Sequence, residues 1–247
     1  MAEFSFDPFA DRYARRTAEM SASEVRALFA VASRPDVVSL AGGMPYIVED
    51  NPYGLLRFEG EPQPTLRSMD PRNVINLGTV SKVFPPGVRV GWALAEPGVL
   101  QRLTLAKEAA DLCSSNLNML VTERHLSGER WRESLHRLVG TYRSRRDAMV
   151  EALGEHFPAD AAWTAPTGGF YVWAKLPAYF GSANLLAAAV ERKVAYVPGT
   201  AFYPDGRGRD RRHLAFCYPT EDRIREGVRR LGELLSDEEE LYRSLSG

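Results

Sequence analysis

The chain has 247 residues, which is enough for one large domain or two small ones with a sizeable core. Its formal net charge of -1 gives no overall field that favours nucleic acid or a membrane surface, and no uninterrupted apolar stretch is long enough to span a bilayer. The first residues include acids and no apolar core run, so we expect no signal peptide. Two widely separated cysteines, Cys113 and Cys217, indicate reduced thiols rather than a metal site. A soluble, cytoplasmic protein is expected.

The N-terminal part of the chain is expected to contain one helix followed by short strands. Apolar side chains recur on one face within residues 11–33, which predicts a helix in an N-terminal arm. An apolar strand then runs into a turn at Gly42 and Gly43. Three further short strands are expected within residues 47–58, 74–82 and 89–95. Because these strands are apolar with few polar alternations, they predict a buried sheet in an α/β protein.

The C-terminal part is expected to be helical first and then to alternate. One helix is predicted over residues 97–112 and a longer one over 128–157, where apolar positions recur at intervals of three, four or seven. Strands within 167–177, 194–199 and 213–219 and a helix within 183–193 are expected next. Thr220, followed by two acids, predicts the start of a closing amphipathic helix over 220–235. The run Glu238–Glu240 is expected to be a frayed, solvated end.

One lysine has neighbours that indicate chemistry. Lys82 follows a strand, in a loop of small residues, and active groups of α/β sheets tend to lie at the carboxyl ends of strands. Thr79 and Ser81 flank it with hydroxyls, and Arg89 follows seven residues later. Hydroxyls, backbone N–H groups and a guanidinium are what a phosphate monoester needs. A lysine beside a phosphate site predicts a Schiff base with pyridoxal phosphate (PLP). The alternative is an ordinary solvated surface lysine.

A second motif, Asp50-Asn51-Pro52-Tyr53, offers partners for the same cofactor. A carboxylate at a strand end can pair with the protonated pyridine nitrogen of PLP, and that charge makes the ring an electron sink. The Tyr53 hydroxyl can hydrogen-bond the phenolic oxygen of the ring. Alone, this sequence is also typical of a turn. Its place ahead of the Lys82 segment favours the cofactor role.

These two segments resemble a known family. Residues 48–54 (VEDNPYG) and 78–92 (GTVSKVFPPGVRVGW) are similar to the fold type I, class I/II aminotransferases, above all to the subgroup acting on 2-aminoadipate and kynurenine. Further similar stretches lie at residues 39–45, 166–177, 194–202 and 221–231. The resemblance implies an α/β PLP-dependent transferase fold with a shortened large-domain sheet and a smaller α+β C-terminal domain. It divides the chain into an arm and helix (1–38), a large-domain remnant (39–128), and a linking helix with the small domain (129–247).

The resemblance also implies roles and partners. Lys82 matches the Schiff-base lysine that moves the proton in transamination. The other matched positions bind phosphate (Thr79, Ser81, Arg89), the pyridinium (Asp50), the phenolic oxygen (Tyr53) and, through a backbone turn, the region of the substrate carboxylate (Gly42, Gly43). The substrates implied are an amino acid and a 2-oxo acid, and the assembly implied is a homodimer, with no nucleic acid, membrane or metal.

The sequence departs from this family in two places. Relatives carry a long segment of the large domain where Tyr46 here runs straight into Ile47, so a Gly-rich phosphate loop, a stacking aromatic residue and an asparagine have no counterpart. Near the C-terminus, alignment on Phe216 puts His213 where the family has the arginine that binds the substrate carboxylate. Arg212 can take that role only with a shifted register, and a one-residue slip in a strand faces the other side.

These departures keep several alternatives open. The chain is either an aminotransferase that works through Lys82 or a non-catalytic, weakly PLP-binding remnant left by an internal deletion. Related PLP chemistry, such as a lyase or decarboxylase, depends on how the substrate is held. A regulator that fuses a DNA-binding domain to an aminotransferase-like domain is disfavoured, because no basic winged-helix segment precedes the matching part. A sheet stripped of central strands is expected to expose apolar edges and faces.

Overall fold

The computed structural model divides the chain into two units after Tyr46. It describes residues 47–177, 179–181 and 184–246, all of which belong to the second unit. The arm helix expected within 11–33 and the Gly42-Gly43 turn lie outside the described residues, so the division at residues 38 and 128 stays a prediction. Every helix in the described part is too short or too polar to cross a membrane.

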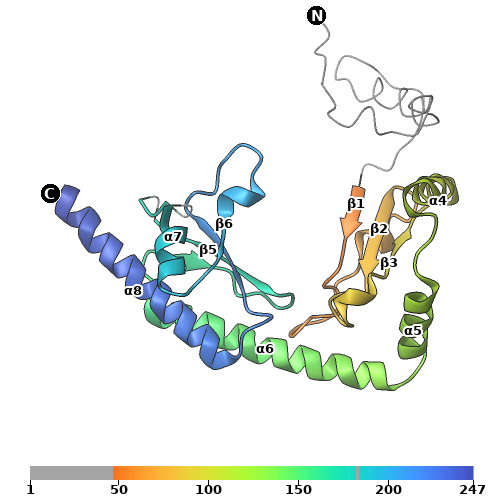
Figure 1. Cartoon of the computed structure of the whole chain (residues 1–247), viewed down its shortest axis with the longest axis horizontal. Helices are drawn as coiled ribbons and strands as arrows, with labels where there is room; N and C mark the ends of the chain where they lie inside the picture. Colours follow the sequence, from red (N-terminus) through yellow and green to blue (C-terminus); the bar gives the residue numbers. More distant parts are fainter. Residues whose placement is uncertain (1–46, 178, 182–183, 247) are drawn as a thin grey trace, which may run out of the picture. The chain divides into compact units, whose positions relative to one another are not determined.

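The first sheet carries the lysine segment. Its strands are β1 (Ile47–Asp50), β2 (Val74–Thr79) and β3 (Gly91–Leu94), in the order β1-β2-β3 (Figure 1). β1 and β2 are parallel, with Asp50 opposite Leu77, whereas β2 and β3 are antiparallel, with Thr79 opposite Gly91. The strand ends of β1 and β2 therefore lie at the same edge. A Cβ at Gly78 would lie 2.3 Å from the Trp92 indole, so any other residue there would have to displace that ring.

This sheet is less buried than the sequence predicts. Only β2 is largely buried, with Val74 and Ile75 in the core. Four apolar side chains of β1 and β3 are 44–57% exposed, namely Ile47, Val48, Trp92 and Leu94. The predicted buried sheet is therefore wrong for β1 and β3. We expected a sheet without its central strands to expose apolar faces, and the structure shows this exposure.

Short helices surround this part of the chain. They are α3 (Leu66–Met69), η2 (Pro86–Val88), α4 (Pro97–Asp111) and α5 (Asn116–Leu126). The structure confirms the predicted helix over 97–112, yet α4 buries no residue. Sequence analysis missed α5, which begins where the Ser115 hydroxyl accepts a hydrogen bond from the Asn118 backbone N–H. We call residues 47–126 the first region and residues 130–246 the second region.

The second region contains a four-stranded antiparallel sheet and three long or medium helices. Its strands, in the order β4-β5-β7-β6, are β4 (Ala162–Trp163), β5 (Tyr171–Lys175), β6 (Val197–Pro198) and β7 (Arg211–Ala215). Its helices are α6 (Arg130–His156), α7 (Asn184–Glu191), α8 (Glu221–Ser246) and the short η3 (Gly199–Phe202). Each of these strands and long helices overlaps a predicted element, except β4, which was not predicted.

Most of the hydrophobic core of the described residues lies in the second region. Alternation along β5 and β7 turns Val172, Ala174 and Leu214 into the core, while their neighbours face the other side. An apolar stripe of α8 packs against α6 (Figure 1). A Cβ on Gly232 of α8 would lie 2.3 Å from the His156 carbonyl oxygen of α6, so only glycine fits there without a shift of the backbone. The stripe consists of Ile224, Val228, Leu231, Leu234 and Leu235.

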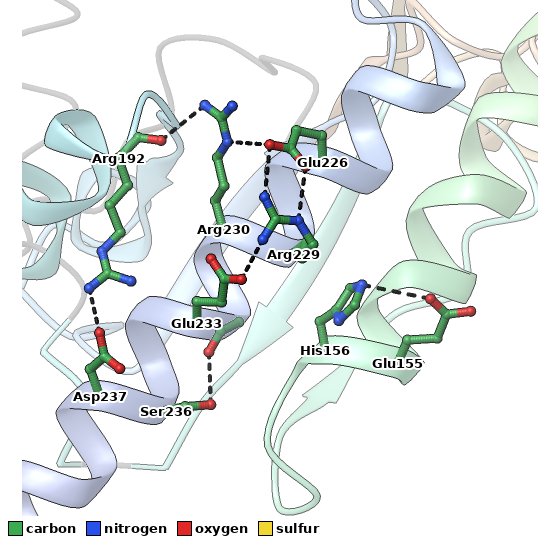
Figure 2. A network of polar contacts seen from close by, with 10 residues as sticks. Glu155, His156, Arg192, Glu226, Arg229, Arg230, Glu233, Ser236 and Asp237 are labelled. Atoms are coloured by element: carbon green, nitrogen blue, oxygen red, sulfur yellow. Dashed lines mark hydrogen bonds and ion pairs between the residues drawn. The ribbon is translucent and has the colours of Figure 1, made fainter.

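Helix α8 is longer than the sequence predicts. The run Glu238–Glu240 lies inside the helix, so the expected frayed end is wrong. Ion pairs at helical spacing explain part of the extension, since Arg243 pairs with Glu239 one turn earlier. Nearer the start of the helix, Glu226 pairs with both Arg229 and Arg230 (Figure 2).

A short segment of the first region joins the β4–β5 turn of the second. The Phe58 backbone N–H donates to the Thr167 carbonyl at 2.7 Å, and the Gly169 N–H donates to the Leu56 carbonyl at 3.0 Å. The buried Arg146 side chain also reaches Glu59 and the Pro166 carbonyl. These contacts bring the preceding Tyr53 against the aromatic residues at the start of β5.

Candidate active site

The edge where β1 and β2 end carries the predicted polar groups. Strand alternation separates two neighbouring acids, Glu49 and Asp50. Glu49 accepts backbone hydrogen bonds from Leu66 and Arg67 at 2.9 and 3.2 Å, so its carboxylate holds α3 in place. Burial opposes the change, but hydrogen bonds led by that of Asn76 lower the pKa of Glu49. Asp50 is exposed at the end of its strand, where a ligand can reach its carboxylate from solvent.

The loop after β2 brings together the predicted hydroxyls. Thr79 Oγ1 lies 2.9 Å from Ser81 Oγ, donates to the Val90 carbonyl at 2.8 Å and accepts from the Ser81 N–H at 3.1 Å. Val80 is buried, and its carbonyl accepts from the next N–H groups of the turn. The loop is therefore held by its own backbone, with Lys82 at its half-buried turn.

Lys82 lies next to an aromatic cluster. Its Nζ is 5.4 Å from the centre of the Tyr53 ring. Tyr53 meets Phe170 and Tyr171 edge to face, with ring centres 5.2 and 6.1 Å apart. A hydrogen bond with Tyr53, together with burial, raises the pKa of Tyr171 to about 12, while the charge of Lys82 opposes the rise. The structure thus places Lys82 and Tyr53 together and adds Tyr171, which sequence analysis missed.

Cys217 is a second residue that sequence analysis missed. Burial raises the pKa of its thiol, and the positive charges of Lys82 and Arg145 oppose that rise. Arg145 also donates a hydrogen bond to the Cys217 carbonyl. The charge of Lys82 therefore acts on residues from two distant segments, β5 and the end of β7. The one available signal was that the segment holding Tyr171 resembles the family; Cys217 lies outside the matching stretches.

Arg89 and Asp50 are the remaining predicted cofactor-binding residues, and both are exposed to solvent. Arg89 adopts a left-handed backbone (φ 54°), and its exposed guanidinium donates only a long 3.3 Å hydrogen bond to the Pro86 carbonyl. Asp50 and Tyr53 line an open hollow of about 640 Å³ whose other wall is the turn at residues 166–169. Both side chains are accessible to a ligand from solvent.

The two candidates on β7 lie on opposite faces of the strand. Arg212 is 1% exposed and lies on the core side, with its guanidinium carbon 5.2 Å from the centre of the Tyr196 ring. Burial lowers the pKa of Arg212, although Tyr196 and Asp210 oppose the shift. His213 faces the other side and stacks on Tyr171 at 4.0 Å. The structure does not bring Arg212 to the lysine, and the side of β7 that faces Tyr171 offers an imidazole instead.

Comparisons with known proteins show which family the chain belongs to. The family model for Aminotransferase class I and II matches residues 41–231. The chain belongs to the class I and II aminotransferases. The aromatic-amino-acid aminotransferase 1 of Thermococcus litoralis is 41% identical over 193 residues, which are 78% of this chain and 46% of that protein. The predicted family is therefore confirmed.

Solved structures confirm the fold as well. The kynurenine aminotransferase of Pyrococcus horikoshii, solved with PMP, KYN and KYA, is 36% identical with a TM-score of 0.75, over 89% of this chain and 52% of that one. LysN, an alpha-aminoadipate aminotransferase of Thermus thermophilus complexed with N-(5'-phosphopyridoxyl)-L-leucine, gives the same identity of 36% and TM-score of 0.75, over 88% and 54%. The fold class of the PLP-dependent aminotransferases is thus confirmed. The chain spans about half the length of the relatives it matches.

Proposed function

We propose that this chain binds PLP at Lys82 and transfers an amino group from an amino acid to a 2-oxo acid. The observation that carries the proposal is the position of the Lys82 amine, 5.4 Å from the Tyr53 ring centre, on a loop that also holds the Thr79 and Ser81 hydroxyls 2.9 Å apart. A primary amine beside clustered hydroxyl donors suits an aldehyde that carries a phosphate.

The donor set of the chain fits this cofactor. When bound, PLP supplies an aldehyde that reacts with amines and a ring that withdraws electrons from the substrate Cα. Thr79, Ser81 and Arg89 would hold the phosphate, and Arg89 can turn toward it because its present hydrogen bond is long. Lys82 would hold the aldehyde covalently and move a proton at the substrate Cα. Two further groups would bind the ring, Asp50 by keeping the pyridine nitrogen protonated and Tyr53 by donating to the phenolic oxygen.

The binding of substrate is proposed more coarsely. The matched relatives are named for aromatic amino acids, kynurenine and 2-aminoadipate, and we propose an amino acid of this range as donor. Burial lowers the pKa of His213, so its ring is neutral at pH 7 and is a weak partner for a carboxylate. Gly43 lies outside the described residues, so its role at the substrate site stays a prediction. The role of Arg212 also stays a prediction, and its burial on the core side of β7 does not favour it. Restoring a guanidinium by His213→Arg should lower the KM for the amino acid about tenfold with little change in kcat.

The test is a titration of the purified chain with PLP, followed by borohydride reduction and peptide mass spectrometry. Wild type should bind saturably, and the reduced adduct should lie on Lys82. Lys82→Ala should lose the adduct, whereas Lys107→Ala should keep it, because Lys107 pairs with Asp111 on the exposed helix α4. An adduct spread over several lysines, or equal in both variants, would contradict the assignment of Lys82.

A second candidate function is a weakly PLP-binding, non-catalytic remnant. The exposed apolar side chains of β1 and β3, together with coverage of about half of each relative, favour it. The two candidates separate at the next step, in which the PLP-loaded chain is offered kynurenine, 2-aminoadipate or an aromatic amino acid with 2-oxoglutarate. Formation of glutamate that needs Lys82 supports the aminotransferase. A Lys82 adduct without glutamate supports the remnant.

Assembly and location are proposed in the same way. We propose a homodimer, because a second copy would cover apolar side chains that the first region leaves exposed. We place the protein in the cytoplasm, where its two unpaired cysteines would stay reduced. Sedimentation at several concentrations checks the dimer, and a monomer at all of them would rule it out.

A further inference from the structure

A second cavity lies in the second region and is independent of the proposed function. It has a volume of about 200 Å³, opens to solvent, and is lined by neither Lys82 nor Tyr53 nor Tyr171. Its floor is apolar and 3–5% exposed, made of Met149, Leu214, Ile224, Val228 and Leu231. Its rim carries four charged residues, Lys193, Arg223, Glu226 and Arg230. The cavity therefore has an apolar interior, which suits the hydrocarbon part of a ligand, and a charged mouth.

A glycine of α8 leaves this space open. Gly227 lies inside the helix and lines the cavity, and a Cβ added to it would meet nothing within 4 Å. Helix interiors disfavour glycine relative to alanine, so the residue weakens the helix without relieving a clash. Gly232, five residues later, is different because its missing Cβ makes room for the His156 carbonyl. Packing explains Gly232 but not Gly227, and the missing Cβ of Gly227 leaves room for a ligand in the cavity.

A lysine at the mouth occupies a backbone position that favours glycine. Lys193 ends the turn after α7 with φ 64°, and the N–H groups of residues 193 and 194 donate to the carbonyls of Val190 and Ala189. Helices usually place glycine at this left-handed C-terminal position, because any Cβ is strained there. Lys193 places an ammonium at the mouth but strains the backbone, whereas glycine would not. The backbone conformation therefore does not explain why a cation stands at this position.

The charges of the rim leave a positive surplus. Glu226 accepts from both Arg229 and Arg230, and these hydrogen bonds lower its pKa to about 2 (Figure 2). Arg230 also donates to the Arg192 carbonyl at 3.2 Å, which fixes its guanidinium. Within the described part of the chain, Lys193 and Arg223 form no ion pair. The acid of the rim is therefore neutralised, and two cations are free to bind an anion.

We propose that this cavity binds a small monocarboxylate with a short branched apolar body. The carboxylate lies between Lys193 and Arg223, and the body covers Met149, Leu214 and Ile224. The apolar floor offers no hydrogen-bond partner to the remaining oxygens of inorganic phosphate or sulfate, so the cavity favours an anion with an apolar body. The cavity is smaller than the roughly 300 Å³ at which drug-sized sites begin, so it suits a body of few carbons.

The proposal is tested by titrating the full chain with 3-methylbutanoate, which has no amino or oxo group and so reports no turnover. Chemical shifts or calorimetry in the absence of PLP measure binding. Saturable binding is expected. Acetate, which lacks the body, and 3-methylbutan-1-ol, which lacks the charge, should each bind at least about tenfold more weakly. Lack of saturation, or an alcohol that binds as well as the acid, overturns the proposal.

Variants that do not weaken the fold locate the site. Gly227→Leu fills the cavity and Lys193→Gly removes the cation while relieving backbone strain, so both should keep or raise the melting temperature. Each should weaken 3-methylbutanoate binding at least about tenfold. Gly227→Ala and Lys193→Arg are the matched controls and should bind within about threefold of wild type, because they keep most of the space and the charge. Equal binding by all four variants would place the ligand elsewhere and overturn the proposal.

Discussion

The sequence predicts helices in both the first and the second region, but the burial of those helices is very different. Helix α4 of the first region buries no residue, and Leu103 and Leu105 on it are 41% and 60% exposed. Helix α8 of the second region buries an apolar stripe against α6 and the β4–β7 sheet. Local patterns suffice to specify a helix in both regions, but burial needs a partner surface. The first region lacks much of that surface, and the chain spans about half the length of the relatives it matches.

The largest expected effect compares one leucine from each region. Leu153 on α6 is 0% exposed, and Leu153→Ala should lower the free energy of unfolding by about 2–5 kcal/mol through lost burial and a cavity. Leu105→Ala on α4 should change it by less than about 0.5 kcal/mol, since its side chain is already in water. Urea unfolding measures both. A large loss for Leu105→Ala would mean that α4 is covered in solution, as in a dimer, and would break the comparison.

A pair of glycines sharpens the account of the second region. Gly232→Ala forces a methyl group to within 2.3 Å of the His156 carbonyl and should cost about 1–3 kcal/mol of unfolding free energy. Gly154→Ala, on the facing helix α6, meets nothing within 4 Å and should stabilise the chain by about 0.5–1 kcal/mol. Thermal unfolding of the two variants checks the signs. Two stabilised proteins would show that α6 and α8 do not approach as described.

Particular residues show how far sequence could predict this molecule. Local signals located β2, α4 and the Thr79-Ser81-Lys82 loop, because each depends on neighbours in the chain. The effect of the Lys82 charge on Tyr171 of β5 could not be predicted, since residues 56–58 pair with the β4–β5 turn across a long sequence separation. The burial of β1 and β3 was predicted wrongly for the same reason. Burial depends on segments distant in sequence, which periodicity does not report.

The two cysteines extend the comparison to reactivity. Cys113 in the first region is exposed, whereas Cys217 in the second is half-buried and burial raises the pKa of its thiol. Alkylation by iodoacetamide at pH 8 should therefore modify Cys113 at least about tenfold faster, because the thiolate is the nucleophile and must be accessible. Peptide mass spectrometry over time measures both rates. Faster reaction of Cys217 would show that the charge of Lys82 outweighs burial there.

The smallest effect concerns the ion pairs of the two exposed helix surfaces. Hydrogen bonds from Arg229 and Arg230 lower the pKa of Glu226 to about 2 in the folded chain, from an ordinary value of 4.5. A depressed folded pKa contributes stability that is present above pH 4.5 and is lost as the pH falls to about 2. The stability difference between wild type and Glu226→Gln should therefore disappear across that window.

Asp111→Asn, which removes the single Lys107 pair of α4, is the matched control. One exposed ion pair contributes less stability than a carboxylate shared by two arginines. Asp111→Asn should therefore lower the free energy of unfolding at pH 7 by less than Glu226→Gln does. An equal or larger loss for Asp111→Asn would show that the α8 network adds nothing to a single pair.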